Sequence, residues 1–184
     1  MAAAVAPLSL TSRPVAIVTA ASRGIGAACA RELSRRGYAL GLMSRSDDLQ
    51  SVATELDAVA VTGSVKREED LRRLVEATLE RYGRIDGVVN NSGHAPKGEL
   101  VELTDQDWQG GFELLVLNVV RVARLVTPTM LAQRSGSIVN LSTFGAVEPS
   151  LRFPVSSVLR ASLGAYARLF TQRYAGSGLR MNNV

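Results

Sequence analysis

Short apolar runs rich in β-branched residues alternate along the chain with longer stretches in which apolar residues recur at helical spacing. The short runs predict strands over residues 15–19, 38–43, 58–61, 86–90, 137–141 and 179–184. The longer stretches predict helices over residues 24–36, 47–56, 66–82, 105–133 and 153–174. In the helix over 105–133, Thr104 is the expected N-cap and Pro128 the expected kink. Its apolar residues on nearly every side predict that both faces are covered.

Strands that alternate with helices pair in parallel through right-handed crossovers. We therefore expect an α/β fold, a doubly wound parallel sheet in three layers, formed as a single domain by residues 13–184. Residues 1–12 are Ala-rich but lack the basic segment and long apolar run of a signal peptide. We interpret them as a flexible tail.

Polar turns follow five of the predicted strands, at residues 20–26, 44–46, 63–65, 90–94 and 141–143. Parallel strands end along one edge of the sheet, where doubly wound proteins bind their ligands. In the first turn, Gly24 and Gly26 have no side chain to keep a diphosphate off the backbone. The free N–H groups and positive end of the following helix face the same place. An ordinary strand–helix connection has similar residues, so the prediction of a dinucleotide site rests on the convergence of all the turns.

The composition is that of a globular domain, and it bears on the partners and the compartment that we expect. The chain has 184 residues, of which 46% are hydrophobic and 21% charged, as in globular domains. Its net charge of +4 is spread over the helices without a basic block, so we predict no nucleic-acid partner. A single cysteine, Cys29, excludes an internal disulfide and fits a reducing, cytoplasmic compartment. Asn118, Arg121 and Arg124 interrupt the most apolar region, so we predict no membrane span and no membrane partner. No metal site is predicted.

Four motifs occur in order along the chain. Residues 19–26 read TAASRGIG, residues 90–93 read NNSG, Asn118 lies in LNV, and residues 137–143 read SIVNLST. Together they resemble the glycine motif TGxxxGxG, the NNAG motif, the mid-helix Asn and the strand before the catalytic Ser of the short-chain dehydrogenase/reductase family. Within that family the chain is interpreted as a divergent member that resembles 3-oxoacyl-[acyl-carrier-protein]-reductase-like proteins. The resemblance extends from about residue 13 to residue 184 and implies a Rossmann-like fold.

The resemblance implies a nicotinamide dinucleotide whose diphosphate lies on the helix start at residues 24–26. The cofactor-binding residues it implies are Thr19, Ala21, Ser22, Arg23, Gly24, Ile25, Gly26, Ser44, Arg45, Ser46, Ser64, Val65, Asn90, Ser92, Gly93 and Arg160. An NAD site normally offers a carboxylate after the second strand, where this chain has Ser-Arg-Ser. Arg45, helped by Arg23, fits the 2′-phosphate of NADP(H), so we expect NADP(H) to be preferred over NAD(H). The alternative is that both arginines are only solvated.

Two residues of the implied cofactor site depart from the family pattern. Ala20 replaces a glycine, which costs about 1 kcal/mol if φ is positive there. Ser64 stands where the family usually has an Asp beside the adenine, and a serine hydroxyl is a weaker partner for the base amine. We expect both departures to leave binding intact.

The resemblance implies hydride transfer between the nicotinamide and a carbonyl or alcohol carbon, with Ser, Tyr, Lys and Asn as the catalytic residues. Thr143 stands at the Ser position, whereas Ser156 and Arg160 stand where the family has the Tyr and Lys of its YxxxK motif. Ser156 and Arg160 are four residues apart and share one helix face. We hypothesise that Thr143 or Ser142 orients the carbonyl together with Ser156, and that Arg160 stabilises the oxyanion.

A proton donor is needed in place of the tyrosine. In this hypothesis, a water held by Asn118 supplies the proton. His94, the only histidine, is an alternative acid. We favour the simpler interpretation of His94 as an exposed loop residue.

These observations predict an NADP(H)-dependent oxidoreductase with a small-molecule carbonyl or alcohol substrate. The alternative is a catalytically impaired NAD(P)-binding homologue with a regulatory or structural role. The helices over 105–133 and 153–174 correspond to the dimer surface of the family, which predicts a homodimer or homotetramer. The family continues beyond its sixth strand, so we interpret the sequence as truncated there or as a cofactor-binding remnant, with the sixth strand as an open edge.

Overall fold

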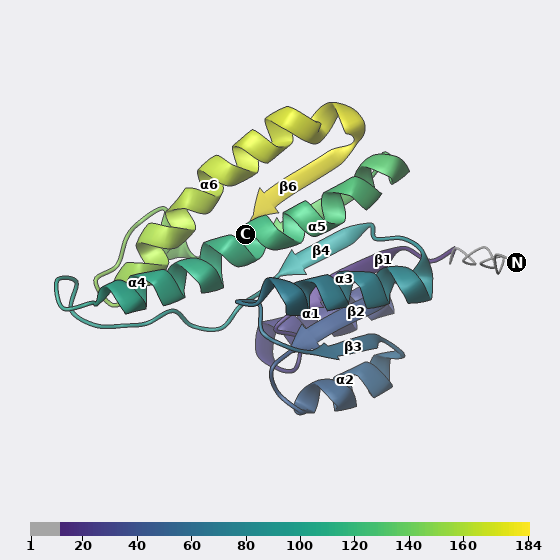
Figure 1. Cartoon of the computed structure of the whole chain (residues 1–184), viewed down its shortest axis with the longest axis horizontal. Coiled ribbons are helices and arrows are strands. Elements are labelled where there is room, and N and C mark those ends of the chain that lie inside the picture. The colour runs from purple at the N-terminus through teal and green to yellow at the C-terminus, as the bar shows by residue number, and fades with distance from the viewer. Residues whose placement is uncertain (1–11) are drawn as a thin grey trace, which may run out of the picture.

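The predicted strands pair in parallel into one sheet, in the order β3-β2-β1-β4-β5-β6 (Figure 1). The computed structural model describes residues 12–184, so the expected tail lies almost entirely outside the described residues. The strands are β1 (Val15–Thr19), β2 (Ala39–Ser44), β3 (Val59–Thr62), β4 (Gly87–Asn90), β5 (Gly136–Asn140) and β6 (Leu179–Asn183). The α/β, doubly wound prediction is confirmed. All six strands lie within two residues of their predicted positions.

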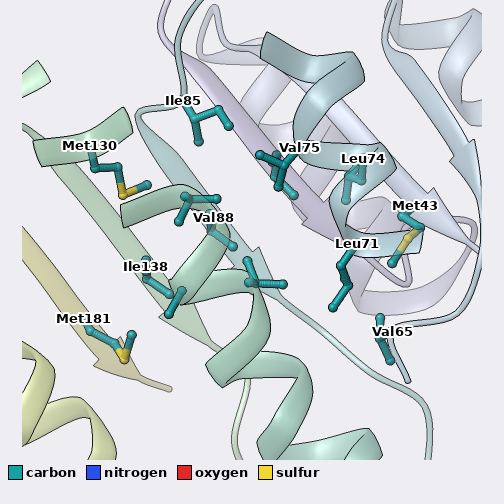
Figure 2. Packing of buried hydrophobic residues seen from close by; sticks show 14 of the residues in the cluster. Met43, Val65, Leu71, Leu74, Val75, Ile85, Val88, Met130, Ile138 and Met181 are labelled. Carbon is teal, nitrogen blue, oxygen red and sulfur yellow. The ribbon is translucent and has the colours of Figure 1, made fainter. Parts of the chain in front are cut away.

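Helices cover the sheet on two sides. They are α1 (Gly24–Arg35), α2 (Asp48–Leu56), α3 (Glu68–Tyr82), α4 (Asp105–Phe112), α5 (Asn118–Gln133) and α6 (Pro154–Tyr174). Buried residues of α1 and α2 form one apolar cluster with β1 and β2. Buried residues of α3, α5 and α6 form a second and larger cluster against the other face, seen from close by in Figure 2. This arrangement gives the three layers that the alternating pattern predicts.

The two halves of the sheet are buried differently. Every residue of β1 is buried, because helices cover both of its faces. Along β5 and β6, by contrast, buried residues alternate with less buried ones. Ile138 and Met181 point into the larger cluster between the sheet and α3, α5 and α6 (Figure 2). The apolar run of β1 is continuous because both of its faces are covered. The pattern of β6 alternates because helices cover only one of its faces.

The predicted helix over 105–133 is continuous but contains a wider turn. Thr104 caps it as expected, in a capping box with Asp107. A π-helical turn, Glu113–Leu117, joins α4 to α5, whereas Pro128 lies inside α5, which continues to Gln133. Such turns occur frequently beside functional sites.

The long helix over residues 105–133 is strongly apolar but only partly buried. Its most apolar 18-residue window has a mean hydropathy of 1.6, which by length and composition alone would suffice to cross a membrane. Half of that window is buried inside the molecule, as expected for a core helix of the sheet. The prediction that both faces are covered is therefore wrong for the single chain: the face toward the sheet is covered, whereas Arg124 and Pro128 are exposed.

The strand order places the candidate site. The chain builds β1, β2 and β3 outward on one side and then returns to place β4 against the other side of β1. The connections that leave β1 and β4 consequently diverge at their carboxyl ends, which opens the crevice where doubly wound sheets bind ligands.

Gly41 provides a test of how closely α3 packs on the sheet. A Cβ at Gly41 would lie 2.1 Å from Oγ1 of the fully buried Thr78. We predict that Gly41→Ala lowers the free energy of unfolding by about 1–3 kcal/mol, because the helix must move away from β2. Urea denaturation measures this. Gly176→Ala is the control, since an added Cβ there meets nothing within 4 Å. Equal midpoints for the two variants would contradict the close packing.

Candidate cofactor and active site

The turn after β1 depends on residues with unusual backbone freedom or small size. Ala20 and Gly24 have positive φ angles of 48° and 56°. A Cβ on Gly26 would lie 2.2 Å from the carbonyl oxygen of Ala20 and 2.7 Å from Nδ2 of Asn91. Glycine is therefore required at position 26 by the protein itself, which lets α1 start directly against the turn.

The N-terminus of α1 is open to an anion. Arg23 is the N-cap residue, and no side chain accepts a hydrogen bond from the first turn. A Cβ added to Gly24 would meet nothing within 4 Å, so the space at the side-chain position of this residue is open. Uncapped N–H groups and the positive helix end together favour a phosphate. The sequence prediction of an anion site at residues 24–26 thus has a suitable geometry.

Asn91 locks this turn to the end of β4. The Thr19 hydroxyl donates to the Asn91 carbonyl at 2.7 Å and accepts from the Asn91 N–H at 2.9 Å. The Asn91 side-chain amide in turn donates to the carbonyl of Ala20 at 3.2 Å. Asn90, Ser92 and Gly93 are predicted site residues, whereas Asn91 is not among them. Its place in the NNSG motif was the available signal, but only the tertiary structure shows the bond across to Thr19.

The glycine turn is also joined to the end of β2. The hydroxyls of Ser22 and Ser44 are 2.8 Å apart and share a hydrogen bond, and Ser44 Oγ also accepts from the N–H of Ser46. Arg23 and Arg45 each directly follow one of the two bonded serines, and both are exposed. This contact brings together two residues that are 22 positions apart in sequence.

A buried carboxylate shapes the turn after β3. Asp70 accepts from the N–H of Ser64 at 2.9 Å and from Arg73 at 2.8 Å, and its side chain is only 6% exposed. The hydrogen bond from Ser64, followed by that from Arg73, lowers the pKa of Asp70 below its ordinary value. Asp70 was not predicted as a site residue. It holds in place the turn that contains Ser64 and the buried Val65, both predicted cofactor residues.

Three asparagines form a ladder across the ends of β4, β5 and β6. Asn90 donates to Asn140 at 2.8 Å, and Asn140 donates to Asn183 at 2.8 Å. The side chain of Asn90, a predicted cofactor residue, is thus directed along the sheet. Its Oδ1 is buried and has no hydrogen-bond partner within residues 12–184.

Asn118 follows the π-helical turn and is 2% exposed. Its amide donates to the carbonyl of Leu114, whereas its Oδ1 has no partner in the described part of the chain. A buried acceptor without a partner is costly. The role of Asn118 in holding a water stays a prediction.

Ser156 and Arg160 line one small cavity of about 50 Å³, together with Gly93 and His94. Arg160 donates to the carbonyl of Leu141 and, at 3.2 Å, to the hydroxyl of Ser92. These bonds bridge the turns that follow β4 and β5. Partial burial lowers the pKa of Arg160, although a guanidinium keeps its charge in a protein.

Thr143 and Ser142 are not among the residues that line this cavity. Thr143 Oγ1 accepts from the N–H of Gly145 and caps a short 3₁₀ turn, Phe144–Ala146. Its hydroxyl proton remains available for donation. Among the other predicted residues, Ala21 is fully buried under the turn and Ile25 is 66% exposed.

Comparisons with known proteins define the class. The model of the family described as enoyl-(acyl carrier protein) reductase matches residues 19–184. The granaticin polyketide synthase putative ketoacyl reductase 2 of Streptomyces violaceoruber is 33% identical over 180 residues, covering 93% of this chain and 71% of that protein. The 3-oxoacyl-[acyl-carrier-protein] reductase of Synechocystis sp. is 29% identical over 177 residues, covering 92% and 72%.

Solved structures of oxidoreductases are also similar to this chain. A crystal structure of L-sorbose reductase from Gluconobacter frateurii, complexed with NADPH and L-sorbose, superposes with a TM-score of 0.89 at 29% identity. The alignment covers 96% of this chain and 69% of that one. The chain therefore belongs to the short-chain dehydrogenase/reductase family of oxidoreductases, as the sequence motifs indicated.

Ala20 provides a test of strain in the glycine turn. A left-handed backbone conformation costs an alanine about 1–2 kcal/mol, and glycine avoids this strain. Glycine, however, loses more conformational entropy on folding, which offsets part of the gain. We predict that Ala20→Gly raises the free energy of unfolding by roughly 0.5–1 kcal/mol. Urea denaturation measures the change. Ala21→Gly is the matched control and should be destabilising, because Ala21 is buried and has no positive φ. A loss of stability in both variants would refute the strain.

Asp70 gives a pH prediction. Its pKa is lowered from 3.8 on folding, so its contribution is present at neutral pH and is lost as the pH falls below about 4. We predict that Asp70→Asn is less stable by about 2 kcal/mol at pH 7 and that this deficit shrinks toward pH 3.5. Urea midpoints across this range measure it. Glu76→Gln, on the exposed face of α3, is the control. A deficit independent of pH would refute the role of the carboxylate.

Proposed function

We propose that this chain is an NADP(H)-dependent oxidoreductase that transfers hydride between the nicotinamide and a carbonyl or alcohol carbon of a small molecule. The observation that carries the proposal is the uncapped, glycine-lined start of α1, flanked by Arg23 and Arg45 at the crevice of the sheet. Membership of an oxidoreductase family and the NADPH bound in the L-sorbose reductase structure support it.

The cofactor half of the proposal follows from charge and geometry. The N–H groups of Gly24 to Gly26 would hold the diphosphate. The turn at Ser64 and Val65 would take the adenine, and Ser92 and Gly93 would lie beside the nicotinamide ribose. Arg23 and Arg45, both exposed and adjacent through the Ser22–Ser44 bond, would hold the 2′-phosphate and give NADP(H) its preference over NAD(H).

The catalytic half rests on the cavity residues. When bound, the nicotinamide supplies or accepts the hydride. Ser156 would orient the carbonyl with Thr143 or Ser142, and Arg160 would stabilise negative charge on its oxygen through N–H groups that Leu141 and Ser92 leave free. Water on Asn118 Oδ1 would supply the proton. General acid help is worth about 10²–10⁴ in rate, so we expect slow turnover without a phenol at position 156.

One observation favours the second candidate, a catalytically impaired NAD(P)-binding homologue. Arg160 bonds two protein groups and so can act mainly as a brace between the ends of β4 and β5. Ser156 is a much weaker acid than a tyrosine. In that case the cofactor site would be intact, and the chain would act through binding.

The long helices support a homodimer or homotetramer as part of the proposal. On α6, Val158 and Leu169 are 54% and 64% exposed, with the exposed Ala161 and Ala165 between them. Phe112 on α4 is 43% exposed. A pair of helices with this much uncovered apolar surface is suited to packing against a second copy. We also propose a reducing, cytoplasmic location, in keeping with the single free cysteine.

Two measurements separate the candidates. Calorimetric titration with NADPH and NADH tests the cofactor site, and loss of NADPH absorbance with a panel of ketones tests hydride transfer. Saturable oxidation supports the enzyme. Tight binding without turnover supports the impaired homologue. Failure to bind either dinucleotide would refute both and favour a purely structural role.

Arg45 provides the sharpest test of cofactor choice. We predict that Arg45→Gln weakens NADPH binding about 10–100-fold and leaves NADH binding nearly unchanged, because only NADPH carries the 2′-phosphate. Calorimetry measures both dissociation constants. Arg180→Gln, an exposed arginine on β6, is the control and should change neither. An equal loss of affinity for both cofactors would contradict the assignment.

A further inference from the structure

The small cavity beside Ser156 carries an unbalanced positive charge. Its lining includes His94, Lys97, Phe153, Ser156 and Arg160, and it contains no aspartate or glutamate. The cavity lies between the loop that follows β4 and the start of α6, two segments that the fold brings together at the carboxyl edge of the sheet. The hypothesis of hydride transfer uses Ser156 and Arg160 here but gives no task to Lys97.

Phe153 contacts two cations, Lys97 of the lining and Arg152. The Lys97 ammonium lies 4.8 Å from the centroid of the Phe153 ring, and the Arg152 guanidinium lies 5.4 Å from it. Contact with an aromatic face steadies a cation without neutralising it. Lys97, Arg152 and Arg160 are therefore held near one another although their charges repel.

No carboxylate offsets these charges. Within residues 12–184, none of the three has a carboxylate oxygen within 4.0 Å. Many basic residues elsewhere do have such a partner. Glu68 on α3, for example, is approached by Arg72, Arg121 and Arg124 within that distance. The three cations beside the cavity are therefore left without a carboxylate partner, whereas many of the remaining arginines have one.

The donors at the cavity are also incompletely used. Arg160 bonds Leu141 and Ser92, which leaves other N–H groups of its guanidinium free. Lys97 has no oxygen partner within residues 12–184, and an ammonium can donate more than one hydrogen bond. A ligand oxygen that accepts from both side chains would satisfy donors and charge at once.

We propose that this cavity binds an anionic group, a carboxylate or a phosphate, on a carbonyl substrate, with Lys97 as a specificity-determining residue. The proposal rests on the proposed hydride transfer, because it names the substrate class for that same site. A space of about 50 Å³ suits a single small polar group and not a whole substrate. The anion would occupy the cavity, and the neighbouring carbonyl would then lie within reach of the Ser156 hydroxyl.

Matched pairs of probes test the proposal. Pyruvate is compared with pyruvamide, and dihydroxyacetone phosphate with dihydroxyacetone, by calorimetric titration of the full chain with and without saturating NADPH. We expect at least one anionic probe to bind about tenfold or more tightly than its neutral partner. The pair that shows the difference distinguishes a carboxylate from a phosphate site. Equal affinities within both pairs would overturn the proposal.

Variants assign the effect to this cavity. Lys97→Met should remove most of the advantage of the anion, Lys97→Arg should restore it, and NADPH binding should stay unchanged in both. Arg173→Met is the matched control, because Arg173 lies 5.5 Å from the Tyr174 ring in a similar contact outside the cavity. An anion preference that survives Lys97→Met unaltered would overturn the role of Lys97.

Binding and turnover measurements together distinguish a failure of the anionic site from a failure of hydride transfer. Anion-selective binding without any oxidation of NADPH would uphold the anionic site and refute hydride transfer. Oxidation of NADPH with neutral and anionic ketones at equal kcat/KM would uphold hydride transfer and refute the anionic site.

Discussion

The close approach of three backbone segments at one point controls the rest of the candidate site. Gly26 lies so near the Ala20 carbonyl and the Asn91 amide that no side chain fits between them. Thr19 and Asn91 then fasten the end of β1 to the end of β4 through paired hydrogen bonds. Because this contact fixes where α1 begins, it also fixes the direction of its free N–H groups. The strained φ of Ala20 is tolerated within the same contact.

Around this point, each turn at the carboxyl edge is held by a polar contact to another part of the chain. Hydrogen bonds join Ser22 to Ser44, the Ser64 N–H to Asp70, and Arg160 to Ser92. Such contacts let the turns stay polar and open at the surface while keeping fixed positions. The core below supplies the rigidity, since β1 is covered on both faces and the larger cluster joins α3, α5 and α6 to the sheet (Figure 2).

The basic residues of the protein differ in whether a carboxylate lies near them. Arginines on α1 and α3 pair with glutamates or aspartates, whereas Arg23, Arg45, Lys97 and Arg160 at the crevice form no ion pair in the described part of the chain. Cations without a carboxylate partner favour anionic ligands along the crevice. A nicotinamide dinucleotide and an anionic carbonyl compound are both suited to it.

The sequence by itself determined the order of the elements, the parallel sheet and the glycine turn, because hydrophobic period and turn residues are local properties. It also located Ser156 and Arg160 on one helix face, since that follows from helical spacing. The roles of Asn91, Asp70 and the asparagine ladder were not predicted from the sequence. The prediction that both faces of the long helix are covered was wrong for the single chain. Those features depend on partners 6 to 72 residues away. Only the tertiary structure decided them, because hydrogen bonds and burial depend on which segments packing brings together.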